Sequence, residues 1–191
     1  MPRNKAFDQQ EILNKAKNLF WSKGYHATSI QDLVDQMQIN RSSIYHTYGD
    51  KYELFKMCLS QYREETYSEL REKLIQEKPV KEILHELFYT IGSDCICEDS
   101  KGCFLVNSAL ETPSDPFVSE ITSKNRVSIQ NDFQTLIEKG KKSGEITSDL
   151  PSGAIAAHLF NSYVGLRVLG ASGMHQKELQ NIISVALSVL E

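Results

Sequence analysis

Apolar side chains recur at intervals of three and four residues along most of the chain, which is the periodicity of amphipathic α-helices. One such stripe runs from Ile30 to Met37 and predicts a short buried helix. Thr28 and Ser29 precede the stripe, and either hydroxyl could accept a hydrogen bond from a free amide of the first turn. Gln31 or Asp32, three residues further on, would then be the reciprocal capping partner. The start of this helix is therefore well marked.

A second short helix is predicted between Asn40, a good N-cap residue, and Gly49, which is typical of helix ends. We expect only Ile44 and Tyr48 of this helix to be buried. A two-turn helix that buries so little displays its remaining side chains, and such a helix fits the major groove of DNA. The side chains expected to face outward are Arg41, Ser42, Tyr45 and His46.

The same periodicity predicts seven further helices, separated by glycine and proline residues that interrupt helices. We find no segment that alternates between apolar and polar residues as a strand does. The predicted fold class is therefore all-α, with about nine helices. The further helices are expected at about residues 6–23, 50–78, 79–98, 103–112, 115–143, 151–171 and 175–190.

A specific run of residues covers both short helices and the start of the next one. It comprises Gly24, Tyr25, Ser29, Ile30, Asp32, Leu33, Val34, Ile44, Tyr45, Thr47, Tyr48, Asp50, Lys51 and Leu54. This run resembles the DNA-binding domain of the tetracycline-repressor (TetR) family. The resemblance implies an N-terminal three-helix helix-turn-helix DNA-binding domain over residues 1–51. It also implies a C-terminal helical ligand-binding and dimerisation domain over residues 52–191.

The resemblance assigns roles to the second short helix and to its flanks. Arg41 and Ser42 would contact base edges, and His46 is expected on the same outward surface. A guanidinium can bind guanine O6 and N7 together, which is worth roughly 1–3 kcal/mol against a wrong base. Lys51 also lies beside the free amides of a helix start, which favour a phosphate. The residues implied to contact the DNA backbone are Thr28, Ser43, Tyr45, Thr47 and Lys51.

Two positions depart from the pattern of the family. Gln38 stands where the turn between the two short helices normally has glycine. We therefore expect Gln38 to take a left-handed conformation, at a cost on the order of 1 kcal/mol. Thr47 stands where an aromatic residue or histidine is usual, so its backbone contact is the less typical one.

Charge is divided unevenly along the chain. The formal net charge is −4, which is unusual for a DNA-binding protein. Residues 1–51 hold seven Lys and Arg against five Asp and Glu, a net charge of +2, which leaves −6 for residues 52–191. Affinity for DNA depends on local neutralisation of phosphates and not on the total charge. The division is therefore compatible with double-stranded operator DNA as a partner.

The last two predicted helices are unusually apolar. Residues 154–171 carry apolar or small side chains on nearly every side, and such a helix must be covered on several sides. An intramolecular core is one explanation. The family resemblance implies another, a four-helix interface between two copies in a homodimer. A two-fold dimer would place two recognition helices about 34–36 Å apart, as a palindromic operator requires.

The resemblance also implies a cavity for a small-molecule inducer among the C-terminal helices. Its expected lining mixes aromatic rings with a few hydrogen-bonding groups. Ordinary core packing is the alternative for each residue, and a core histidine is the commoner explanation for His158. No cofactor is expected. The candidate ligand-binding residues are Phe88, Tyr89, Cys103, Phe104, Asn107, Phe133, His158, Asn161 and Tyr163.

Cys103 is the most specific of these candidates. Gly102 and Cys103 resemble the start of the sixth helix in the TetR subfamily that includes the N-ethylmaleimide reductase repressor, where that cysteine senses electrophiles and oxidants. Positive charge from a helix start and from Lys101 would favour the reactive thiolate. The alternative is that Cys103 is simply a small buried apolar residue, as free cysteines often are.

Cys95 and Cys97 lie close to Cys103 in the sequence, whereas Cys58 lies apart. Three thiolates could hold a soft metal ion or an arsenical. Residues two apart on a regular helix point to different sides, however, and the spacing is not that of structural zinc sites. We therefore rank a metal below an electrophile and assign no metal ligands.

Other classes of function are disfavoured by what the chain lacks. There is no glycine-rich phosphate loop, strained nucleophile turn or histidine pair with metal-ligand spacing, so an enzyme is not expected. No run approaches the roughly twenty apolar residues of a membrane span, so we expect a cytoplasmic protein with no membrane partner. The sequence predicts a homodimeric transcriptional repressor. A helical dimer of this fold that acts through protein contacts without DNA remains the alternative.

Overall fold

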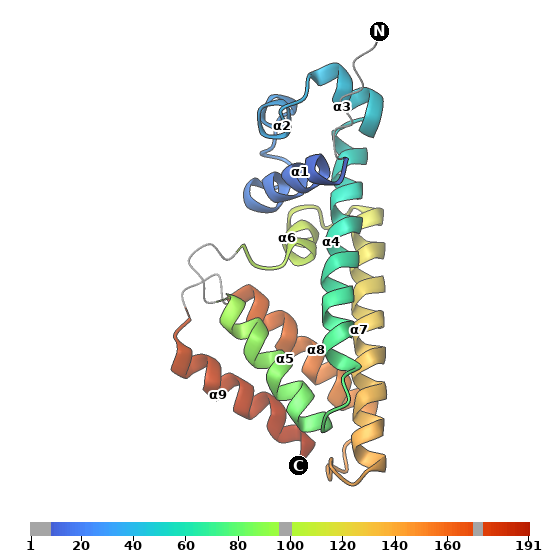
Figure 1. The fold of residues 1–191 in the computed structure, drawn as a ribbon, viewed down its shortest axis with the longest axis vertical. Coiled ribbons are helices and arrows are strands. Elements are labelled where there is room, and N and C mark those ends of the chain that lie inside the picture. The colour runs from blue at the N-terminus through green and yellow to red at the C-terminus, as the bar shows by residue number, and fades with distance from the viewer. Residues whose placement is uncertain (1–8, 96–100, 170–173) are drawn as a thin grey trace. The chain divides into compact units, whose positions relative to one another are not determined.

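The computed structural model describes residues 9–95, 101–169 and 174–191. In these ranges the secondary structure is helical throughout (Figure 1), which confirms the predicted all-α fold. No helix there is both long and apolar enough to cross a membrane. The helices are α1 Gln9–Lys23, α2 Ile30–Met37, α3 Arg41–Tyr48, α4 Lys51–Leu74, α5 Val80–Cys95, α6 Phe104–Glu111, α7 Pro116–Lys142, α8 Ser152–Leu169 and α9 Gln176–Leu187, followed by a 3-10 helix at Ser188–Leu190.

Contacts divide the chain into two compact units. Unit 1 comprises Met1–Glu64 and Phe104–Ile121, and unit 2 comprises Glu65–Cys103 and Thr122–Glu191. Helix α6 thus belongs to the same unit as the N-terminal helices, although it follows α5 in the chain. The units are not consecutive segments, and the predicted functional boundary at residue 51 stays a prediction.

The core of unit 1 is aromatic. Phe104, at the start of α6, lies between rings of α1 and α4. Its centroid is 6.0 Å from that of Phe55, 5.7 Å from that of Tyr62 and 6.3 Å from that of Trp21. Phe20 completes the cluster, 5.3 Å from Phe55 in an edge-to-face arrangement, which is a favoured geometry for aromatic pairs. These contacts attach α6 to the N-terminal helices.

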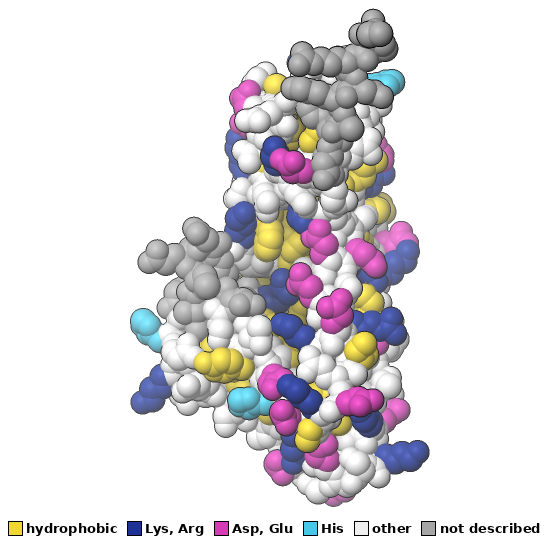
Figure 2. Space-filling view, in the orientation of Figure 1, with side chains coloured by type: hydrophobic (Ala, Val, Ile, Leu, Met, Phe, Trp, Pro, Cys, Tyr) yellow, Lys and Arg dark blue, Asp and Glu magenta, His cyan; other side chains and the backbone are white. Residues whose placement is uncertain are grey.

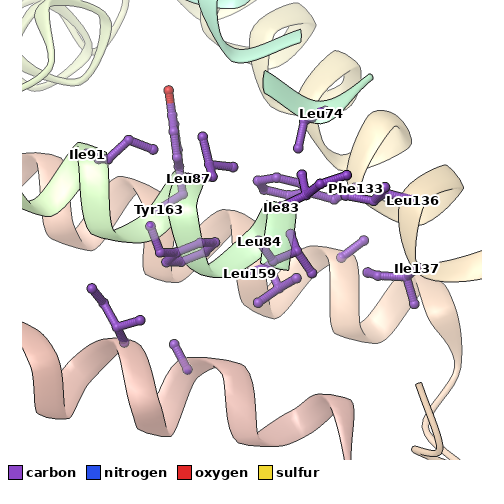
Figure 3. Packing of buried hydrophobic residues seen from close by; sticks show 14 of the residues in the cluster. Leu74, Ile83, Leu84, Leu87, Ile91, Phe133, Leu136, Ile137, Leu159 and Tyr163 are labelled. Carbon is purple, nitrogen blue, oxygen red and sulfur yellow. The ribbon is translucent and has the colours of Figure 1, made fainter. Parts of the chain in front are cut away.

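The core of unit 2 is formed by apolar side chains of α4, α5, α7, α8 and α9. Figure 3 shows Leu84 of α5, Phe133 of α7 and Leu159 of α8 packed against one another. Helices α5 and α9 approach closely at Gly92, where an added Cβ would lie 2.1 Å from a methyl carbon of Leu179. A side chain at position 92 would therefore require the Leu179 side chain or the helix that bears it to shift.

Candidate nucleic-acid interface and ligand cleft

Helix α2 begins with a capping box, and of the two pairs that the sequence allows it is Ser29 with Asp32. The Ser29 hydroxyl accepts from the Asp32 amide at 3.1 Å, and an Asp32 carboxylate oxygen accepts from the Ser29 amide at 2.7 Å. Lys23 Nζ lies 2.6 Å from the same carboxylate. Hydrogen bonds from Lys23 and Ser29 hold the pKa of Asp32 well below its usual range. The helix start is thus fixed by charge-assisted hydrogen bonds.

The turn between α2 and α3 confirms the expected strain at Gln38. Its φ and ψ are 56° and 36°, in the left-handed region, and its amide donates to Val34 at 3.0 Å. Asn40 then caps α3, with its Oδ1 accepting from the Ser43 amide at 2.8 Å. Both caps lie where the sequence predicts them, so the two helices of the hairpin have fixed starts.

Helix α3 is anchored by two residues and displays the others. Ile44 and Tyr48 are buried, as predicted, and Gly49 ends the helix with a φ of 82°. Arg41 lies against Tyr45, with its guanidinium carbon 5.6 Å from the ring centroid and Nη2 3.4 Å from the hydroxyl. Ser43 is half-buried. The candidate contact residues that are exposed on α3 are Arg41, Ser42, Tyr45, His46 and Thr47.

Lys51 opens α4 beside a tyrosine from another segment. Its Nζ lies 4.4 Å from the ring centroid of Tyr25. Burial lowers the pKa of Lys51, while the nearby carboxylates of Glu111 and Asp32 act in the opposite direction. Asp50 Oδ1 already accepts from the first-turn amides of residues 52 and 53, at 2.8 and 2.9 Å. A phosphate contact at this helix start therefore falls mainly to Lys51 itself.

Thr28 differs from the other candidate backbone contacts. Its side chain is fully buried, and its hydroxyl donates to the Gly24 carbonyl at 2.5 Å. This hydroxyl stabilises the turn between α1 and α2 and does not face solvent. Any contact that Thr28 makes with DNA must come from its backbone.

Glu111, the last residue of α6, holds that same turn and was not among the candidate residues. One carboxylate oxygen accepts from the Tyr25 amide at 2.9 Å, and the other accepts from the His26 amide at 2.7 Å. Gly24 has a φ of +87°, and a Cβ there would lie 2.9 Å from the Glu111 carboxylate. Tyr25 and Glu111 are 86 positions apart in the sequence, which explains why no local sequence signal reveals the contact.

Of the predicted ligand-binding residues, the structure brings together Phe88, Phe133 and Tyr163, whose ring centroids lie 6.5 Å apart for the first pair and 6.4 Å apart for the second. The other candidates do not join them. Phe88 and Phe133 lie within the core of unit 2, Phe104 belongs to the aromatic cluster of unit 1, and Cys103 is buried immediately before α6. His158 is exposed, so its interpretation as a core histidine is wrong. Tyr89, Asn107 and Asn161 are exposed as well.

Tyr163 is the one candidate that lines a cleft, which lies in unit 2 between α4, α5 and α8 and has a volume of about 120 Å³. Arg167, one turn further along α8, is also part of it and was not predicted. A sequence signal existed, because Arg167 is the single Lys, Arg, Asp or Glu in the apolar run 154–171. The lining residues are Thr66, Glu69, Leu70, Lys73, Leu87, Ile91, Tyr163 and Arg167.

The cysteines that the structure describes do not form a metal site. Cys58 and Cys103 are both buried and free. Burial raises the pKa of the Cys58 thiol, which makes it a poor nucleophile. Cys97 and the side chain of Cys95 lie outside the described residues. Among the described ones, no three histidine, cysteine or acidic side chains are grouped as a metal would require.

A capped helix hairpin with an exposed polar second helix, in an all-helical chain, defines the class of helix-turn-helix transcriptional regulators. Residues 12–58 match the sequence model of the family described as "Bacterial regulatory proteins, tetR family". The chain is 32% identical to the uncharacterized HTH-type transcriptional regulator YezE of Bacillus subtilis, with all of both chains covered. The protein belongs to the TetR family.

Other relatives agree with this assignment. The chain is 28% identical to the HTH-type transcriptional repressor ComR of Escherichia coli, over 97% of this chain and 90% of that protein. A cysteine mutant of the TetR family regulator CifR, solved with 26-bp operator DNA, is 25% identical with a TM-score of 0.83, over 97% and 98% of the chains. Reduced NemR of E. coli has the same TM-score, with 96% of this chain and 97% of that chain covered. Because the identity is only 15%, this likeness shows the fold alone.

Proposed function

We propose that the protein is a homodimeric repressor that binds a palindromic operator through α3 and is released by a small-molecule inducer or by modification of a thiol. The observation that carries this proposal is the construction of α3. Two buried residues, Ile44 and Tyr48, anchor it, while Arg41 and its neighbours face solvent. The operator-bound CifR structure and the repressor ComR are relatives that support it.

Binding to the DNA upstream of its own gene tests the proposal. Wild-type protein should give a specific complex that weakens steeply with salt, because phosphate contacts release counterions. Arg41→Ala should lose roughly 1–3 kcal/mol per half-site and discriminate less between bases. Arg126→Ala is a matched control, since Arg126 is exposed on α7 in unit 2. If this DNA is not bound specifically even at low salt, a dimer acting through protein contacts becomes the better explanation.

The homodimer is supported by exposed apolar side chains on the last two helices. Val168 and Leu169 of α8 are exposed by 39% and 49%, and Val185 of α9 is exposed by 70%. Gly165 has nothing within 4 Å of the position its Cβ would take, so another helix could approach α8 there. We propose that a second copy covers this face, which is the family arrangement that the resemblance implies.

Sedimentation equilibrium with two matched variants tests the dimer. Val185→Glu should raise the monomer fraction and weaken operator binding, because it places a charge in the proposed interface. Ile75→Glu is the control, since Ile75 follows α4 and is exposed by 71%, about as much as Val185. Equal behaviour of the two variants would exclude α9 from the interface.

Release through a thiol is supported by the position of Cys103, which directly precedes α6, while Glu111 at the other end of α6 holds the turn before α2. Adduct formation at a buried thiol adds volume to a packed site and would displace α6. Displacement would break the Glu111 hydrogen bonds and shift the population towards a form with low operator affinity.

N-ethylmaleimide tests the thiol route. The reagent should release wild-type protein and Cys58→Ser from the operator but leave Cys103→Ser bound. If Cys103→Ser is released as readily as wild type, Cys103 is not the sensor and another thiol of the chain reacts. If the reagent releases neither protein, the thiol route is wrong and release falls to a ligand in the body of the protein.

A further inference from the structure

The cleft between α4, α5 and α8 has an apolar floor. Leu70, Leu87 and Ile91 are all buried and line it from α4 and α5. Figure 3 shows the Tyr163 ring standing beside Leu87 and Ile91, with its hydroxyl directed past them and away from α9. A ligand in this cleft would thus place hydrocarbon against three aliphatic side chains, with a polar group near the tyrosine hydroxyl.

Arg167 is held in a defined orientation at the edge of this floor. Its Nη1 donates to the Tyr163 hydroxyl at 2.9 Å, and its guanidinium carbon lies 5.6 Å from the centroid of the same ring. Both residues lie on α8, one turn apart, so a rigid helix sets their spacing. A guanidinium with a fixed plane is suited to a carboxylate, which it can bind through two parallel hydrogen bonds.

Lys73 supplies a second positive charge from α4. It is half-buried, and it forms no ion pair with any residue that the structure describes. Glu69, one turn earlier, is exposed and is the only acidic group among the lining residues. The lining therefore has two cations and one anion. Figure 2 shows dark blue basic and magenta acidic side chains interspersed along this face, with yellow hydrophobic ones between them.

We propose that this cleft binds a small organic carboxylate, with Arg167 and Lys73 on the carboxylate and Leu70, Leu87 and Ile91 against a short hydrocarbon body. A cationic ligand would face two positive charges with a single exposed Glu69 to receive it. An inorganic phosphate has no hydrocarbon to place against Leu70, Leu87 and Ile91, so it would leave the apolar floor of the cleft without a partner. If the protein is the repressor proposed above, on which this inference rests, the bound carboxylate is its inducer.

The position of the cleft gives the ligand a route to the DNA-binding residues. Thr66 and Lys73 belong to the second half of α4, and the same helix begins with Lys51. A ligand that closes α4 against α5 and α8 therefore acts on the helix that contains the candidate phosphate contact. If the ligand binds one position of α4 more tightly than another, ligand binding and operator binding are coupled through this helix.

Calorimetry and thermal unfolding of the full chain, without DNA, test the ligand class. The probes are butyrate, hexanoate, octanoate and benzoate, each with its amide and its amine. In wild-type protein, at least one carboxylate should bind ten-fold or more tightly than its amide and amine. Arg167→Gln and Lys73→Gln should each reduce this preference at least ten-fold, while Arg126→Gln should leave it unchanged.

Glu69→Gln should change carboxylate affinity in the opposite direction. Glu69 is exposed, so its replacement should not disturb folding. Removal of its negative charge should tighten carboxylate binding several-fold. The inference is overturned if no carboxylate stabilises the protein more than its amide, or if the preference survives in Arg167→Gln and Lys73→Gln. Operator binding by the ligand-free protein is measured separately, so failure of the DNA-binding proposal and failure of the ligand class give different results.

Discussion

Helices α2 and α3 have the same construction but use their polar side chains differently. Each has eight residues and a side-chain N-cap, and each buries two residues four positions apart. In α2 the polar groups bond within the protein: Lys23 to Asp32 at 2.6 Å, and Gln31 to Asp35 at 2.9 Å. This helix has few side chains left for a partner.

In α3 the polar groups remain available. Arg41 contacts Tyr45 of the same helix, but the side chains of Ser42, His46 and Thr47 make no hydrogen bond within the described part of the chain. Both helices are anchored by two buried residues, although α2 also has Ile30, Asp32 and Val34 half-buried. The further difference between a positioning helix and a recognition helix is whether its polar groups already have partners. Each of the following experiments changes one side of this comparison.

The largest effects are expected where the two helices are alike. Leu33→Ala in α2 and Ile44→Ala in α3 should each lower the free energy of unfolding by about 2–5 kcal/mol, because both side chains are fully buried. Denaturant unfolding at a fixed protein concentration measures both, since the proposed dimerisation would make stability depend on concentration. A cost well under 1 kcal/mol for Ile44→Ala would mean that α3 is not anchored as described.

The next effect separates the helices. Ser42→Ala should weaken operator binding by about 0.5–1.5 kcal/mol per half-site with little change in stability, because it removes one hydrogen-bonding group from the displayed face. Gln36→Ala, at an exposed position of α2, should leave operator affinity unchanged. Fluorescence anisotropy with labelled operator measures both variants. Equal losses would remove the distinction between the two helices.

The caps should differ in their response to acid. Ser29→Ala and Asn40→Ala should each lower the free energy of unfolding by about 1 kcal/mol at neutral pH. Because the folded pKa of Asp32 lies below the ordinary value of about 3.9, its contribution is present above pH 4 and is lost as the pH falls towards the folded pKa.

Unfolding measured at pH 7 and pH 3 therefore distinguishes the two caps. Asp32→Asn, which removes the charge next to the Ser29 cap, should cost less at the lower pH, because Asp32 is then protonated in the unfolded chain and must release its proton on folding. Asn40 does not titrate, so the cost of Asn40→Ala should stay nearly constant. A constant cost for both variants would show that the charge of Asp32 does not stabilise α2.

The smallest effect concerns the turn that joins the helices. Gln38→Gly should stabilise the protein by at most about 1 kcal/mol, because glycine adopts the left-handed conformation without strain. At the end of α3, Gly49 also has a positive φ, and Gly49→Ala should destabilise. Thermal unfolding under identical conditions compares the two. A loss of stability in Gln38→Gly would show that the Gln38 side chain has a stabilising role.

The hairpin could be predicted from sequence because its determinants are local. Capping pairs such as Ser29 and Asp32 lie within one turn, and the pair Ile44 and Tyr48 shares a face by helical spacing alone. The cleft could not be predicted in the same way, since it depends on which side of each of three helices faces the others. Phe88 and Phe133 are of a residue type that often lines ligand pockets, but in this protein they fill the core. Arg167 was detectable only as a charge in an apolar helix.

The hydrogen bonds of Glu111 have a consequence for measurement. The amides of Tyr25 and His26 are protected by a carboxylate that comes from α6, and not by the helix that precedes or follows them. A hydrogen-bonded amide exchanges its proton with solvent only when the bond opens. Hydrogen exchange at these two adjacent amides therefore records how often α6 leaves its place, in the intact protein and without any label.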